Sequence, residues 1–139
     1  TKVEDAMVRR ALTVGHTTDG DIVLVSGDGR TKWNFPGGGR EPGETIQETA
    51  SRELAEEACA TAESLELIGY QHVLHLDDDD NVVDEELQAR FRGTVALHPW
   101  DPQFEMAGRR TVPANEVEAT IGPWWQPTHL RALLDSAYL

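Results

Sequence analysis

Residues 37–60 read GGGREPGETIQETASRELAEEACA, and this stretch decides how the chain folds. Residues 37–44 form a glycine-rich loop, and the remainder has the pattern of a helix. Thr45, followed three residues later by Glu48, is a capping-box sequence and predicts that the helix begins near Thr45. Apolar residues that recur every four positions give this helix one narrow apolar stripe: Ile46, Ala50, Leu54 and Ala58.

The same helix carries acidic residues at a spacing that brings them together. Glu53, Glu56 and Glu57 stand at positions i, i+3 and i+4. At about 100° per residue, Glu53 and Glu57 fall at the edge of the apolar stripe. Like charges at this spacing repel by about 0.2–0.5 kcal/mol per pair, and a hard divalent cation is their natural partner. The alternative is a solvated acidic helix face.

Together, the loop and the helix resemble the Nudix box of the MutT-like, single-domain Nudix hydrolases. The preceding run Trp33–Pro36 is similar to the usual approach to the box. The positions that carry the resemblance are Gly38, Glu44, Arg52, Glu53, Leu54, Glu56 and Glu57. Cys59 stands where the family has glycine, and Ala60 stands where it prefers a larger aliphatic residue. The missing glycine would follow the helix in a left-handed conformation, which costs a non-glycine residue roughly 1 kcal/mol.

The resemblance implies an α/β/α sandwich with a mixed β-sheet between helices. It also implies a hydrolase dependent on Mg²⁺ or Mn²⁺ that cleaves the pyrophosphate linkage of a nucleoside diphosphate joined to another moiety. A nucleoside triphosphate or a nucleotide sugar is a substrate of this type. The alternative is a non-catalytic module with the same fold that binds or senses a nucleotide metabolite.

The resemblance further implies roles for individual residues. Glu53, Glu56 and Glu57 are expected to hold the cation, together with the main-chain carbonyl of Gly37. Arg52 is expected to orient Glu53 or a neighbouring carboxylate, although Arg52 and Glu56 could also form a plain i, i+4 surface pair.

The loop residues are expected to shape the site without taking part in the chemistry. Glu44 should hold the loop to the helix, and Gly38 and Gly43 should let the loop fold back against it. The general base stays open: it is one of the three box glutamates, or else Glu116 or Glu118, since family members often add a carboxylate from a loop near that point.

Length and composition are those of one globular domain over residues 1–139, with 39% hydrophobic and 27% charged residues. No run of 18 apolar residues would cross a membrane, and no signal-peptide pattern opens the chain. A single cysteine, Cys59, excludes an internal disulfide and favours a cytoplasmic protein. The family resemblance also suggests a homodimer.

The net charge of −13 argues against duplex nucleic acid as a partner. The same charge would repel a phosphorylated small molecule unless bound cations reverse the local field. The expected partner is therefore a small nucleoside diphosphate derivative that meets the protein through Mg²⁺ or Mn²⁺.

The rest of the chain predicts strands around the box and a helix at the end. The expected strands are 7–17, 22–25, 33–35, 65–76, 87–97 and a final strand over 125–128. A helix capped by Thr128 should follow. Arg90 and Arg92 share one face of the strand 87–97 and could meet phosphates, or could be ordinary surface charge.

Overall fold

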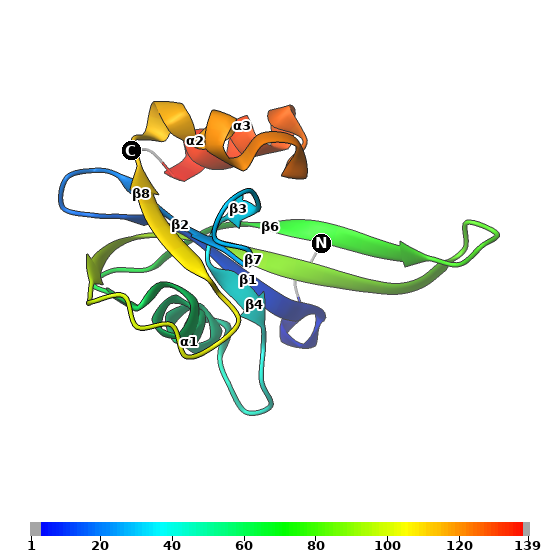
Figure 1. Cartoon of the computed structure of the whole chain (residues 1–139). Coiled ribbons are helices and arrows are strands. Elements are labelled where there is room, and N and C mark those ends of the chain that lie inside the picture. The colour runs from blue at the N-terminus through cyan, green and yellow to red at the C-terminus, as the bar shows by residue number, and fades with distance from the viewer. Residues whose placement is uncertain (1–3, 138–139) are drawn as a thin grey trace.

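Three layers make up the computed structural model, which describes residues 4–137. A mixed β-sheet lies between helix α1 on one face and helices α2 and α3 on the other (Figure 1). The predicted α/β/α sandwich is therefore confirmed. In chain order the elements are η1 (Asp5–Met7), β1 (Val8–His16), β2 (Ile22–Ser26), β3 (Trp33–Asn34), β4 (Gly37–Gly39), α1 (Ile46–Ala58), β5 (Ala60–Ala62), β6 (Glu66–Leu76), β7 (Val82–Leu97), β8 (Gly108–Val112), α2 (Ala114–Ile121), η2 (Gly122–Trp124) and α3 (Pro127–Ala137).

Strand β1 is the centre of the sheet. It runs parallel to β7 on one side and antiparallel to β2 and β4 on the other. The strand order is β3-β2-β1-β7-β5, with β8 paired to β2 and β6 paired to β7. Because β4 pairs directly with β1, residues Gly37–Gly39 are part of the sheet, and this pairing fixes their position relative to helix α1.

Alternating side chains of the central strands pack on opposite faces of the sheet. Val23 and Val25 point towards α1 and pack with Leu54, whereas the intervening Leu24 packs with α2 and α3. This alternation is the ordinary period of a strand covered on both faces. The capping box is present as predicted, because Thr45 Oγ1 accepts from the Glu48 N–H at 3.1 Å and Glu48 Oε1 accepts from the Thr45 N–H at 2.9 Å.

The final predicted strand, 125–128, is wrong. Helix α3 begins at Pro127, where the missing proline N–H costs no hydrogen bond, and Gln126 Oε1 accepts from the His129 N–H at 2.9 Å. The short strands β4, β5 and β8 carry no alternating pattern of their own and were not predicted. Strand β7 also begins five residues earlier than expected, at Val82.

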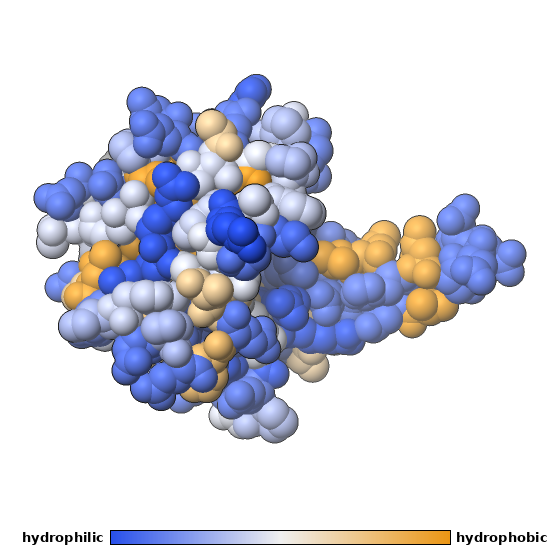
Figure 2. Space-filling model, viewed as in Figure 1, coloured by the Kyte–Doolittle hydropathy of each residue, from blue (hydrophilic) through white to orange (hydrophobic). Residues whose placement is uncertain are grey.

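Strands β6 and β7 continue past the body of the molecule as a two-stranded arm (Figure 1). Asp77 and Asn81 close the turn at its tip, as expected for a hairpin. Apolar side chains lie exposed along the arm (Figure 2): Leu74, Leu76, Val82 and Val83. None of the helices within residues 4–137 has both the length and the apolar character needed to span a bilayer.

Candidate active site

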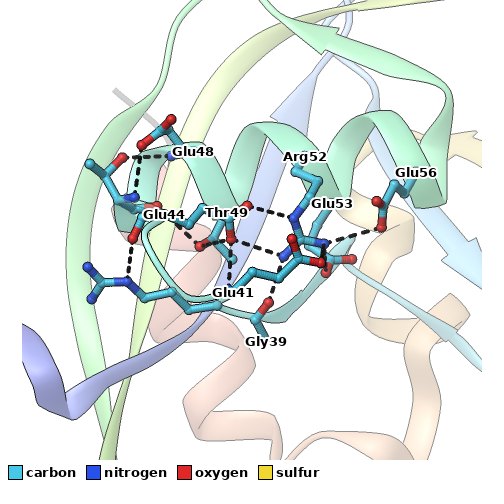
Figure 3. A network of polar contacts seen from close by, with 10 residues as sticks. Gly39, Glu41, Glu44, Glu48, Thr49, Arg52, Glu53 and Glu56 are labelled. Atoms are coloured by element: carbon cyan, nitrogen blue, oxygen red, sulfur yellow. Dashed lines mark hydrogen bonds and ion pairs between the residues drawn. The ribbon is translucent and has the colours of Figure 1, made fainter.

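The glycine-rich loop is fastened to helix α1 by an ion pair between Glu44 and Arg52 (Figure 3). Arg52 Nε donates to Glu44 Oε2 at 2.7 Å, and Arg52 Nη2 donates to the Gly39 carbonyl oxygen at 2.7 Å. Thr49 Oγ1 adds a hydrogen bond to Glu44 Oε1 at 2.7 Å. The hydrogen bonds that Glu44 accepts from Arg52, from the Glu41 N–H and from Thr49 lower its pKa to about 2. Glu44 thus stays ionised and connects the loop to the helix.

Arg52 also reaches two carboxylates of its own helix. Its Nη1 donates to Glu53 Oε1 at 2.9 Å and to Glu56 Oε2 at 3.2 Å. The Arg52–Glu53 contact and the i, i+4 pair with Glu56 therefore exist together, and the Arg52 side chain is only 20% exposed. One planar guanidinium fixes three carboxylates at once, which a lysine ammonium could not do with the same directions.

The box glutamates share one cleft of about 580 Å³ with the glycines of β4. Glu53 and Glu57 are both buried, and Glu57 Oε1 accepts from the Gly37 N–H at 2.8 Å. The Glu53 carboxylate fills the space where Gly38 has no side chain. Helix α1 thus directs these carboxylates at the strand that the glycine loop forms.

The carboxylates of this cleft are partly removed from water and outnumber its positively charged side chains. Burial raises the pKa of Glu57 to about 7, with the nearby Glu53 and Glu105 adding to the shift, and burial also raises the pKa of Glu53. Three cations line the cleft, Arg10, Lys32 and Arg52, against five carboxylates: Glu41, Glu53, Glu56, Glu57 and Glu105.

Hard oxygen donors with excess negative charge fit a divalent cation such as Mg²⁺ or Mn²⁺. Within residues 4–137, no set of three or more Asp, Glu, His or Cys side chains is already gathered into a metal-binding group. The contacts described above show why: Arg52 holds Glu53 and Glu56, and the Gly37 N–H holds Glu57. The carboxylates that line the cleft still fit a divalent cation in donor type and in charge.

The loop after β7 supplies a carboxylate that the sequence analysis missed. Glu105 lines the same cleft and acts electrostatically on Glu57. The two expected candidates lie elsewhere, because Glu116 and Glu118 belong to α2 on the opposite face of the sheet. Glu118 forms an ion pair there with Arg131 at 3.0 Å. Residues 103–107 have no periodic pattern, so nothing in the sequence placed Glu105 over helix α1.

The end of helix α1 shows how the chain accommodates the missing glycine. Cys59 adopts the left-handed conformation predicted for this position, with φ 50° and ψ 46°, and its N–H bonds the Leu54 carbonyl oxygen. Arg109 of β8 covers the helix end by donating to the carbonyl oxygens of Ala58 at 2.9 Å and His98 at 2.7 Å. A positive charge at a helix C-terminus is favourable, so Arg109 stabilises the C-terminal end of α1.

Comparison with protein families gives a match to the NUDIX domain model over residues 7–134. The chain belongs to the Nudix family. This Nudix protein is 29% identical over 117 residues to Nudix hydrolase 4 of Arabidopsis thaliana, an alignment that covers 82% of the chain. The chain spans about half of that relative's length, 54%.

Solved Nudix structures share the architecture. The MutT protein from Bacillus halodurans is 25% identical and superposes with a TM-score of 0.76, covering 94% of this chain and 84% of that one. The NUDIX domain of Shewanella oneidensis NrtR was solved in complex with ADP ribose. It superposes with a TM-score of 0.68 at 16% identity, covering 99% of this chain and 88% of that one. At 16% identity, the similarity to the NrtR domain shows a shared fold only.

Proposed function

We propose that this Nudix protein is a hydrolase dependent on Mg²⁺ or Mn²⁺ that cleaves the pyrophosphate linkage of a nucleoside diphosphate joined to another moiety. One observation carries the proposal: Glu53, Glu56 and Glu57 face a single cleft against Gly37 and Gly38, and the five carboxylates that line this cleft outnumber its three cations. The family assignment is consistent with it, as is the complex of the NrtR domain with ADP ribose.

The residues of the cleft have distinct tasks in this proposal. Glu53, Glu56 and Glu57, with the main-chain carbonyl of Gly37, would hold the cation, and Arg52 would keep Glu53 and Glu56 aimed into the cleft. When bound, the cation supplies charge for the diphosphate oxygens and lowers the pKa of a water molecule.

Hydrolysis then needs a place for one proton. Water adds its oxygen to one phosphorus, the bond from that phosphorus to the bridging oxygen breaks, and the bridging oxygen leaves with the other phosphoryl group. A carboxylate in the cleft accepts the proton that the water releases. The candidates for that base are the three box glutamates and Glu105, which reaches the cleft from a different element.

The test is a substrate panel with purified protein. Nucleoside triphosphates, nucleotide sugars and ADP ribose are incubated with Mg²⁺, with Mn²⁺ or with EDTA, and the released products are measured. We expect turnover that depends on the metal, a loss of at least about 100-fold in Glu57→Gln, and a smaller loss in Glu105→Gln. Glu118→Gln is the matched control, because its carboxylate lies on the opposite face of the sheet.

The alternative function, a sensing module, gives a different result on the same panel. A sensing module would bind a nucleotide derivative tightly and leave it intact over hours, with or without metal. Absence of turnover from the whole panel, combined with tight binding of one member, would replace the hydrolase proposal with this one. The expected homodimer and the cytoplasmic location stay predictions, and a mass measurement in solution tests the dimer.

A further inference from the structure

A second pocket, of about 410 Å³, adjoins the carboxylate cleft on the side of the sheet covered by α3. The two spaces share Arg10, Asn34, Phe35, Gly37 and Gly38, so they adjoin along these residues. The chain carries a net charge of −13, yet no Asp or Glu is among the described residues that line this pocket. It contains instead two arginines, Arg10 and Arg90.

Arg90 is a buried cation without a counter-ion. Only 9% of its surface is exposed, and its guanidinium carbon lies 4.8 Å from the centre of the Trp125 ring. The guanidinium donates to the side-chain carbonyl of Gln71, whereas its Nε has no hydrogen-bond partner. Throughout residues 4–137, no carboxylate comes within ion-pair distance of Arg90.

The neighbouring Arg92 shows what an ordinary arginine on this strand does. Its guanidinium pairs with Glu66 at 2.5 Å and bonds the Ser136 carbonyl oxygen at 3.1 Å. Arg92 is therefore neutralised within the protein, and Arg90 is not. Burying an unpaired charge is costly, and a guanidinium keeps its charge under all ordinary conditions.

An anion would offset this cost better than a neutral carbonyl group. A carbonyl oxygen can accept a hydrogen bond but leaves the charge uncompensated, whereas a phosphate accepts two parallel hydrogen bonds and neutralises the charge. The Arg90 guanidinium lies against the Trp125 ring, and the Trp125 Nε1–H donates to Asn34 Oδ1 at 2.9 Å. Arg90 is thus positioned before any ligand arrives.

The sheet register sets the length of a ligand that spans both spaces. Gly37 of β4, Leu12 of β1 and Arg90 of β7 lie in one row across three neighbouring strands. Two strand spacings separate the backbones of Gly37 and Arg90 by about 10 Å. A diphosphate against Gly37 and Gly38 could therefore carry one sugar-sized unit, with its own anionic group, as far as the Arg90 guanidinium.

We propose that the second pocket binds a phosphate monoester on the sugar unit attached to the cleaved diphosphate, and that Arg90 is the residue that selects it. The inference rests on the proposed hydrolase function, because it assigns a substrate class to the same site. It predicts that Arg90 contributes to binding of the phosphorylated member of any substrate pair and little to its unphosphorylated counterpart.

Substrate pairs that differ by one phosphate monoester test the inference directly. NADPH is compared with NADH, and coenzyme A with its dephosphorylated form, by kcat/KM with Mg²⁺ and by calorimetric titration in EDTA. We expect the wild-type protein to prefer the phosphorylated member of at least one pair by about 10-fold or more. Arg90→Met, which keeps an apolar stem against Trp125, should bring that ratio close to one. Arg90→Lys should keep part of the preference.

Arg92→Met is the matched control, since Arg92 lies two residues away on the same strand and does not line the pocket. It should keep the wild-type preference. Thermal unfolding of each variant confirms that it is folded before it is scored. The inference is overturned by turnover of the panel without a phosphate preference, or by a preference that Arg90→Met leaves intact. An Arg90-dependent preference between nucleobases in place of phosphates would overturn it too.

The binding measurement separates this inference from the proposed function. An Arg90-dependent preference for the phosphorylated member in EDTA, without any hydrolysis, would support the pocket assignment while the hydrolase proposal fails. Hydrolysis of both members at equal rates, with equal binding, would support the hydrolase and overturn the pocket assignment.

Discussion

The α-carbon of Gly38 lies directly against the carboxylate of Glu53: a Cβ added at Gly38 would be 2.5 Å from Glu53 Cδ and 2.9 Å from Oε2. The atoms in the way belong to the end of a flexible side chain, so the carboxylate can turn aside while the backbone stays in place. Gly38 is therefore needed for the position of a cleft carboxylate more than for the stability of the fold.

Gly38→Ala should separate activity from stability. We expect a loss of about 100-fold in kcat/KM, because a displacement of about 1 Å in a reacting group has this effect. The free energy of unfolding should change by less than about 1 kcal/mol. Gly39→Ala is the control, since a Cβ there would meet only Arg10 Nη1, at 3.9 Å. Equal activity in the two variants would contradict the role given to Gly38.

Arg52→Lys should show that the guanidinium fork, and not the charge alone, organises the site. Lysine cannot reproduce the simultaneous hydrogen bonds to Glu44, Glu53 and the Gly39 carbonyl. We expect at least a 10-fold loss of activity and a loss of about 1–2 kcal/mol in the free energy of unfolding, measured by chemical denaturation.

Arg9→Lys is the comparison for Arg52→Lys. The side chains of Arg9 and Asp84 are both more than 40% exposed, so solvent screens their ion pair, and Arg9→Lys should lower the free energy of unfolding much less than Arg52→Lys does. A similar loss of stability in both variants would mean that the Arg52 network is no stronger than a surface pair.

Glu57→Gln should stabilise the metal-free protein at alkaline pH. Burial raises the pKa of Glu57 to about 7, above its value in the unfolded chain. Between about pH 4.5 and 7 the folded state therefore binds more protons than the unfolded state, and the contribution of Glu57 to stability falls as the pH rises. The glutamine is neutral at every pH and avoids this loss.

Denaturation in EDTA at pH 5 and pH 8 measures the effect. The variant should gain about 1–3 kcal/mol over the wild type at pH 8 and much less at pH 5. Added Mg²⁺ should narrow the difference by stabilising the wild type, because a cation that binds only the folded state adds to its stability. If the free energies of unfolding of the two proteins depend on pH in the same way, the pKa of Glu57 is not raised.

Cys59→Gly should stabilise the protein by about 0.5–1 kcal/mol. Cys59 has φ 50°, a conformation that glycine adopts without steric cost and other residues do not. Asp80→Gly is the comparison: Asp80 also has a positive φ, 64°, but aspartate tolerates this region, so its gain should be smaller. Destabilisation by Cys59→Gly would show instead that the weak contact of Cys59 Sγ with the Asp101 carbonyl, at 3.6 Å, matters more than backbone strain.

Local sequence signals predicted the parts of the fold that depend on neighbouring residues. The capping box located the start of α1, and alternating apolar residues located β1, β2 and β6. The same signals did not predict the short strands β4 and β5, because three residues are too few to show an alternating pattern. The strand expected at 125–128 failed for a different reason: Trp125 packs its ring edge-on against Phe35, and the chain turns into α3 directly after it.

By itself, the sequence determined the α1 helix, its carboxylates at i, i+3 and i+4, and the left-handed position of Cys59, because each depends on residues within a few positions. Only the tertiary structure decided which distant groups face those carboxylates. It brought Glu105 from a loop without periodicity, moved Glu116 and Glu118 to the opposite face, and left Arg90 buried beside Trp125 without a counter-ion. Such meetings are set by strand register and by packing across the sheet, which no local pattern encodes.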